Sequence, residues 1–67
     1  MQLKDILQQA VDNNSFVELS LSNGQHLKAK VKAIYGELVV FHQMPGREFF
    51  QAYIPYQHIV YVEVRVG

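Results

Sequence analysis

Cysteine is absent from this sequence of 67 residues. The chain can therefore form neither a disulfide framework nor a thiolate metal site. A chain of this length buries only roughly 60% of the surface that its unfolded form exposes, so one small core is marginally stable. Because disulfide and thiolate-metal staples are excluded, association with further copies is the remaining source of stability. The composition agrees, since 49% of the residues are apolar, more than one small domain can hide from water.

An excess of charge of either sign is also absent. Six basic and six acidic residues give a formal net charge of zero, which argues against capture of nucleic acid by bulk electrostatics. Any basic surface must be local. Lys28, Lys30 and Lys32 occupy alternate positions, and such a stripe is most simply a solvated strand face, with phosphate contact as the alternative.

Long hydrophobic runs are missing as well. No stretch of about 18 apolar residues is present, as a membrane-spanning helix would need. The beginning of the sequence, residues 1–5, lacks the apolar core and cleavage signal of a secretory peptide. We therefore expect a cytoplasmic protein without a membrane partner.

Groups that would indicate catalysis are sparse. His26, His42 and His58 are too widely spaced for a local zinc motif. No serine stands with a base in a recognisable nucleophile motif, and the scattered acidic residues form no obvious pair for acid-base chemistry. The sequence predicts no enzyme, no metal site and no cofactor.

Two local patterns indicate a helix followed by a hairpin. Apolar residues recur at helical spacing from Leu3 to Val11, and the pattern ends in the polar run at 12–15. Apolar and polar residues alternate on either side of Asn23-Gly24, which is typical of two antiparallel strands joined by a tight turn. The second arm is too long for a flat two-stranded ribbon, so we expect it to curl around a small barrel.

Three further strands complete the predicted fold. Tyr35-Gly36 and the Pro-Gly run at 44–46 mark turns, and Pro55, which lacks a backbone N–H, ends the strand before it. The last strand is expected to carry one apolar face made of Val60, Val62, Val64 and Val66. The expected elements of a single domain, 1–67, are a helix at about 2–12 and strands at about 16–22, 25–34, 37–43, 48–54 and 58–66. The predicted fold class is mainly β, an N-terminal α-helix followed by a five-stranded, strongly bent antiparallel small barrel.

Two motifs occupy fixed places in this order of elements. The first is the alternating run at 17–31, which contains Asn23-Gly24 and continues into the apolar segment 34–41. The second is Tyr56-Gln57-His58, followed by Ile59-Val60. Together with the short loops, they resemble the motifs of the Hfq and wider Sm-like (LSm) family, in which a Tyr-Lys-His triplet enters the last strand. The likeness covers nearly the whole chain, and the sequence is identified as a divergent bacterial or phage-type member with an Sm-like, SH3-like barrel.

This resemblance implies a homo-oligomeric ring in which strand four of one copy pairs with strand five of the next. It also implies binding of single-stranded RNA near a central pore, in RNA metabolism or regulation. The residues predicted to contact RNA are Tyr35, Gly36, Tyr56, Gln57, His58 and Lys30. The residues predicted to form the oligomer interface are Phe49, Phe50, Tyr53, Val60, Tyr61 and Val62.

Several positions depart from the family pattern. Glu37 stands where Hfq-like proteins carry an aromatic ring that stacks on a base, and a carboxylate cannot stack and repels phosphate. Ser20 replaces the tyrosine of the opposite-face pocket, and Gln57 replaces the basic residue of the triplet. Residues 11–14, Val-Asp-Asn-Asn, stand at the arginine-rich rim of Hfq. Every RNA site of the family is thus weakened.

A different function remains open for this reason. The alternative is an oligomeric small-barrel scaffold or protein-interaction module that has lost RNA binding. His58 is interpreted equally well as a structural loop residue, and the aromatic residues at 49, 50, 53 and 61 more often build core and interface than stack on bases. In favour of RNA, a ring repeats each weak contact around its pore, which raises avidity.

Overall fold

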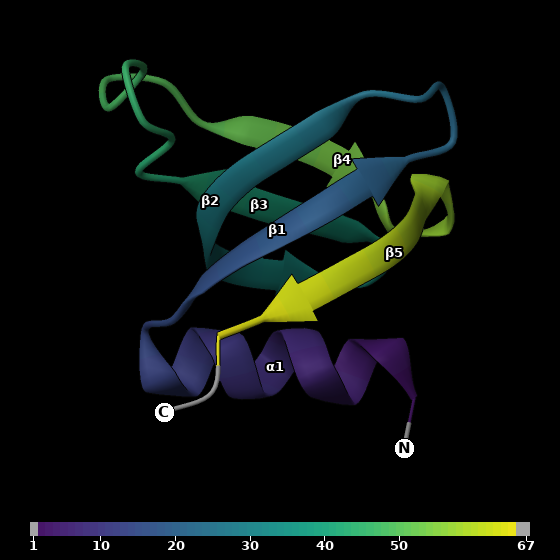
Figure 1. Cartoon of the computed structure of the whole chain (residues 1–67). Helices are drawn as coiled ribbons and strands as arrows, with labels where there is room; N and C mark the ends of the chain where they lie inside the picture. The colour runs from purple at the N-terminus through teal and green to yellow at the C-terminus, as the bar shows by residue number, and fades with distance from the viewer. Residues whose placement is uncertain (1, 66–67) are drawn as a thin grey trace.

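The computed structural model describes residues 2–65 and contains one helix followed by five antiparallel strands (Figure 1). The predicted order of a helix and five strands is therefore confirmed. The strands form one sheet in the order β4-β3-β2-β1-β5, so β4 and β5 are its two edges. The elements are α1 (Leu3–Asn13), β1 (Phe16–Leu21), β2 (His26–Tyr35), β3 (Leu38–His42), β4 (Ala52–Pro55), the 3-10 turn η1 (Tyr56–His58) and β5 (Ile59–Val64). Within residues 2–65, no helix is long and apolar enough to cross a membrane.

Local capping sets both ends of α1. At its start, the Asp5 carboxylate accepts the Gln2 N–H at 3.0 Å, and the Asp5 N–H donates to the Gln2 carbonyl at 3.0 Å. At its end, Asn14 adopts a left-handed conformation with φ 54°, and the Ser15 N–H returns to the Ala10 carbonyl at 3.0 Å. The polar run that follows the apolar stripe thus stops the helix and turns the chain into β1.

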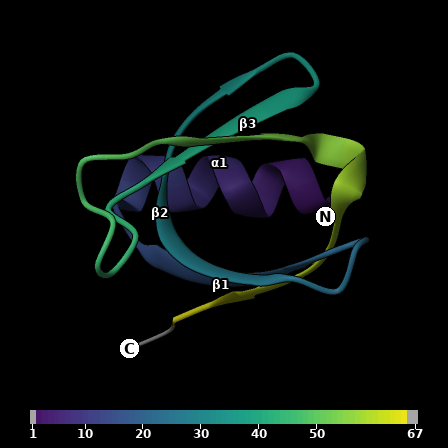
Figure 2. The same cartoon turned by 90° about the horizontal axis from the view of Figure 1, so that it is seen from above.

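The long strand β2 bends the sheet. Its first half, up to Lys30, pairs with β1, and its second half, from Lys30, pairs with β3. A register shift between Val31 and Ala33 leaves Lys32 without a partner residue on β3, and such a bulge bends a strand and increases its twist. As a result, the sheet curls so that β1 and β3 lie on opposite sides of the molecule, with α1 across one end (Figures 1 and 2).

The core fills the inside of this curl. Leu7 and Ala10 of α1 are buried in one cluster with residues of β1, β2, β3 and β5, and Ala52 and Ile54 of β4 pack against this cluster. Phe41 is the largest fully buried side chain, at 0% exposure. The strand residues buried with it are Val17, Leu19, Ala29, Val31, Val39, Val40 and Ile59. Because the inward residues of β1 and β2 alternate with exposed ones, these strands follow the period predicted from the sequence.

The prediction that Val60 belongs to the apolar face of β5 is wrong. The strand pairs Ser20 with Tyr61 but Leu21 with Ile59, so Val60 is an extra residue in a bulge. Ile59 points into the core at 5% exposure, whereas Val60 is 62% exposed. Val62 and Val64 are half-buried, and Val66 lies outside the described residues. The bulge reverses the alternation within β5, which periodicity alone could not indicate.

The fourth strand is shorter than the predicted range of about 48–54, because β4 spans Ala52–Pro55. The residues before it form turns, in which the Arg47 N–H bonds to the Met44 carbonyl at 2.8 Å and the Phe50 N–H bonds to the Arg47 carbonyl at 3.0 Å. Phe49 and Phe50 consequently lie on a loop between β3 and β4, outside the strand that was predicted to carry them.

Candidate functional site

Two loops that are distant in the sequence meet at one end of the sheet. The first is Gly36-Glu37, between β2 and β3, where Gly36 adopts φ 58°, a conformation that favours glycine. The second is η1. The Tyr56 N–H donates to the Glu37 carbonyl at 2.6 Å, so the turn before β3 and the turn before β5 are joined by their backbones. Four of the six predicted RNA contacts, Gly36 and 56–58, lie on these two joined segments.

His58 is held to the β1–β2 hairpin by two contacts. Its carbonyl accepts the Ser22 N–H at 2.8 Å, and its Nδ1 lies 3.0 Å from the Ser22 hydroxyl. The side chain is nonetheless exposed. Because Nδ1 is occupied, Nε2 is the ring atom that an incoming ligand would contact. His58 is therefore bound into the loop through one side of its ring, and contact of Nε2 with a base stays a prediction.

Lys4 of α1 completes this end of the molecule. Its ammonium lies 3.0 Å from the Glu37 carboxylate and 5.0 Å from the centre of the Tyr56 ring. The ion pair is solvent-exposed, so its contribution to folding is at most about 1 kcal/mol. The pair places a cation directly beside the Glu37 carboxylate. Sequence reasoning missed Lys4 because nothing local relates the first turn of the helix to residue 37.

A shallow groove of about 310 Å³ runs from His58 towards β4. The Leu21–Asn23 end of the hairpin forms one wall, and Tyr53–Pro55 forms the other. The Tyr53 ring is 59% exposed. The groove therefore has the Tyr53 ring and the His58 imidazole in its lining. Aromatic and imidazole rings are side chains on which unpaired bases can stack.

The remaining predicted contacts lie apart from the joined loops to different degrees. Tyr35 ends β2 immediately before Gly36, and its ring is 64% exposed. Lys30 lies at the middle of β2, where its ammonium is 5.0 Å from the centre of the Phe16 ring. Lys30 is therefore engaged with β1 and does not belong to the loop cluster.

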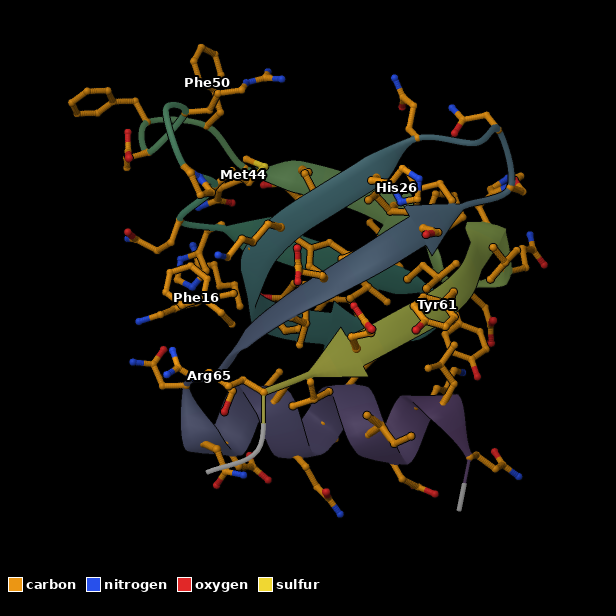
Figure 3. The ribbon with its side chains drawn as sticks, viewed as in Figure 1. Phe16, His26, Met44, Phe50, Tyr61 and Arg65 are labelled. Carbon is orange, nitrogen blue, oxygen red and sulfur yellow. The ribbon has the colours of Figure 1, made fainter. Side chains whose placement is uncertain are left out.

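The residues predicted to form the oligomer interface fall into two groups. Tyr53 on β4, and Val60 and Tyr61 on β5, are more than half exposed on the edge strands, and Val62 is half-buried beside them. Phe49 and Phe50 are exposed on the β3–β4 loop. Figure 3 shows Phe50 at the tip of that loop and Tyr61 at the opposite flank of the sheet.

The outer face of the sheet carries a second polar cluster. Tyr61 on β5 pairs with Ser20 on β1, which in turn pairs with His26 on β2. The Ser20 hydroxyl lies 2.9 Å from His26 Nδ1, and the Tyr61 hydroxyl donates to the Glu63 carboxylate at 2.9 Å. This bond and the negative charge of Glu63 raise the pKa of Tyr61 above its ordinary value of 10.0.

Glu63→Gln is expected to lower the pKa of Tyr61 towards that ordinary value, because the charge that disfavours tyrosinate is removed. The neutral phenol is favoured in the folded protein, so its stabilising effect is complete below pH 10.0 and is lost as the pH rises through the folded pKa. Tyrosinate absorbance against pH measures the shift. Glu48→Gln is the control, because the Glu48 carboxylate accepts the Gly46 N–H and bonds to no tyrosine hydroxyl among the described residues. Equal titration curves for the two variants would contradict the conclusion that Glu63 raises the pKa of Tyr61.

Among residues 2–65, no group of three His, Asp or Glu side chains is placed to hold a metal ion. The arrangement of this end of the molecule is instead one of exposed rings, amides and a single cation. Such groups can stack, donate and accept hydrogen bonds, and pair with a phosphate.

Comparison with known proteins bears on the fold. No family model and no curated protein sequence matches the chain. Among solved structures, the crystal structure of an Hfq protein from Anabaena sp. superimposes with a TM-score of 0.74 and 24% sequence identity, covering 96% of this chain and 100% of that one. This similarity extends over the helix and the sheet together. The chain therefore has the Hfq-type, Sm-like fold that its two motifs predicted.

Proposed function

We propose that this protein is a non-enzymatic, ring-forming Sm-like protein of the cytoplasm, which binds short single-stranded RNA in RNA metabolism or regulation. The observation that carries the proposal is the junction of the two loops, where the Tyr56 N–H bonds to the Glu37 carbonyl and His58 is bound to Ser22. An Hfq-type fold is the second support. The junction fixes several base-binding groups on rigid backbone before any ligand arrives, which lowers the cost of binding.

The edges of the sheet support the proposed ring. The edge strands β4 and β5 present unpaired backbone groups together with exposed Tyr53, Val60 and Tyr61. An exposed, partly apolar edge strand is a template for pairing with another chain. Pairing β4 of one copy with β5 of the next covers both edges, and a closed ring leaves none exposed.

The side chains at the junction have different roles in the proposed binding of RNA. In this proposal, His58 Nε2 and the Gln57 amide contact base edges, and the exposed Tyr35 ring offers a stacking surface. Lys4, already beside Glu37, exchanges its carboxylate partner for a phosphate when RNA is bound. Each contact is weak, so the repetition of the site around the pore supplies the affinity.

The scaffold alternative has one specific observation in its favour. The carboxylate of Glu37 occupies the junction and already neutralises Lys4, the nearest cation. A ring with this arrangement on every copy would attract RNA less than one with free lysines. The two functions differ in a simple property, because a scaffold would not bind RNA even at low salt.

His58→Ala is expected to weaken RNA binding about five- to tenfold, the equivalent of about 1 to 1.4 kcal/mol for one lost hydrogen bond to a base. Fluorescence anisotropy with labelled uridine-rich and adenine-rich oligomers, at low and at moderate salt, measures the change. His26→Ala is a matched control, because His26 is also exposed and also bound through Nδ1 to a serine. The control is expected to bind as the wild type does.

Three results would contradict the proposal. Absence of wild-type binding at low salt would favour the scaffold function. Equal losses for the two histidine variants would remove the loop junction from the binding site. Light scattering that finds a monomer at micromolar concentration would contradict the ring in both functions.

A further inference from the structure

The loop between β3 and β4 carries two exposed phenylalanines, and Phe49 is the most exposed large apolar side chain of the described residues. Phe49 is 100% exposed and Phe50 is 56% exposed. The tip that presents them is ordered by its own contacts, since Met44 and Arg47 form an antiparallel bridge and the Arg47 guanidinium lies 4.9 Å from the centre of the Phe50 ring. Met44, at 5% exposure, anchors the loop in the core. Phe49 and Phe50, here called the aromatic tip, form an exposed apolar projection on an ordered loop. Such a projection can insert into an apolar recess on another molecule.

A groove of about 740 Å³ lies on the outer side of the sheet, where β1 begins and β5 ends. Ser15–Glu18 form one side of this terminal groove, and Glu63–Arg65 form the other. Its lining combines the exposed Phe16 ring, Pro45 and Val64 with two carboxylates, Glu18 and Glu63, and two cations, Lys28 and Arg65. Figure 3 shows Phe16 and Arg65 on the same flank as Phe50 but well below the loop tip.

The directions of the edge strands decide which segments meet between neighbouring copies. Across the molecule, β4 and β5 run in roughly opposite senses (Figure 1). When β4 of one copy pairs with β5 of the next in an antiparallel ladder, the start of β4 lies beside the end of β5. The residues just before Ala52 then continue past Val64 of the neighbour. Those residues are Phe49, Phe50 and Gln51, and the neighbour's terminal groove is the surface that they reach.

We propose that the terminal groove of one copy is the docking site for the Phe49-Phe50 tip of the next copy, a second contact between subunits besides the paired strands. This inference rests on the ring of the proposed function. Two features fit a second copy as the occupant. The aromatic tip matches a recess containing Phe16 and Val64. Antiparallel pairing of β4 with the neighbour's β5 also brings the residues before Ala52 past the end of that strand.

Cross-linking tests the contact directly, because the natural chain contains no cysteine. Glu48→Cys and Ser15→Cys chains are prepared separately, mixed through a reversible dissociation step and treated with a short bis-maleimide. The mixture is expected to give a covalent dimer that contains one chain of each kind. Glu48→Cys mixed with Tyr35→Cys, which lies at the other end of the sheet, is expected to give none.

A second pair separates this inference from the ring itself. Tyr53→Cys on β4 and Tyr61→Cys on β5 report the pairing of the edge strands. If this pair cross-links and the Glu48 and Ser15 pair does not, the ring stands and the docking of the loop is wrong. If neither pair cross-links, the ring and the docking are both wrong.

The aromatic tip should also contribute to assembly. The double variant Phe49→Ser/Phe50→Ser is expected to raise the concentration at which the ring is half dissociated by at least tenfold, measured by sedimentation velocity. Both side chains are exposed on a loop, so the protomer is expected to keep its fold, as circular dichroism would show. Tyr35→Ser removes a similarly exposed ring and is expected to leave assembly unchanged. If the double variant assembles as the wild type does, the inference is overturned. If that variant in addition binds RNA more weakly, the aromatic tip belongs to the RNA-binding surface instead.

Discussion

Phe41→Ala is expected to leave the isolated chain largely unfolded. Phe41 is the fourth of the five residues of β3, pairs with Val31 on one side and Ala52 on the other, and is 0% exposed. Truncating a buried phenylalanine to alanine costs about 3 to 5 kcal/mol, through lost apolar burial and the cavity that remains. A single core in a chain of this size supplies about 3 to 5 kcal/mol in total. The expected loss is therefore of the same size as the whole stability of the protomer.

Urea denaturation followed by circular dichroism measures this loss. Phe16→Ala is the control, because it removes the same side chain from a position that is 38% exposed on the outer face, and it is expected to cost about 1 kcal/mol. If association stabilises the fold, the midpoint for Phe41→Ala rises with protein concentration. A loss below about 1 kcal/mol at low concentration would show that the core can close around the missing ring.

The parts of the fold that the sequence predicts well are those decided by local contacts. The stripe from Leu3 to Val11 specified α1, since helical spacing and the polar stop are properties of one short segment. The Asn23-Gly24 turn behaves likewise, because Gly24 adopts φ 89° and the Asn23 side chain accepts the Gln25 N–H at 3.0 Å.

The parts of the fold that differ from the prediction depend on strand pairing across the sheet. Val60 is displaced from the apolar face of β5 by a bulge that exists only because β1 pairs with both Ile59 and Tyr61 in different registers. The start of β4 moves to Ala52 because the residues before it form turns, in which the Phe50 N–H bonds to the Arg47 carbonyl. Phe49 and Phe50 have strong strand propensity. That propensity could not show that they would form an exposed tip.

The candidate site divides in the same way. The Tyr35-Gly36 turn was predicted from local turn signals and the triplet at 56–58 through the Sm-like resemblance, and the backbone bond from Tyr56 to Glu37 brings the two segments together. Lys4 could not be predicted, because its position beside Glu37 depends on how α1 crosses the end of the sheet. Because Lys4 lies beside it, the Glu37 carboxylate is one half of an ion pair. A single substitution at residue 37 therefore both releases the Lys4 ammonium and introduces a new side chain at the loop junction.

Glu37→Phe is expected to increase the affinity for single-stranded RNA by about 5- to 150-fold for each base that gains a stacking partner, the equivalent of about 1 to 3 kcal/mol. The substitution introduces a ring at the loop junction, removes a negative charge near phosphate and releases Lys4 from its 3.0 Å ion pair. The backbone carbonyl of residue 37 still accepts the Tyr56 N–H, so the junction is kept. Loss of the exposed ion pair costs at most about 1 kcal/mol of folding free energy.

Two further variants separate the causes of this gain, with anisotropy titrations of uridine-rich and adenine-rich oligomers as the measurement. Glu37→Gln removes the charge without adding a ring, so its affinity should lie between those of the wild type and Glu37→Phe. Glu48→Phe makes the same change of charge and side chain on the β3–β4 loop and should leave RNA affinity near that of the wild type. If Glu37→Phe binds no better than Glu37→Gln, bases do not reach the loop junction. If all three variants gain equally, net charge rather than a defined site governs binding, because each of them removes one carboxylate.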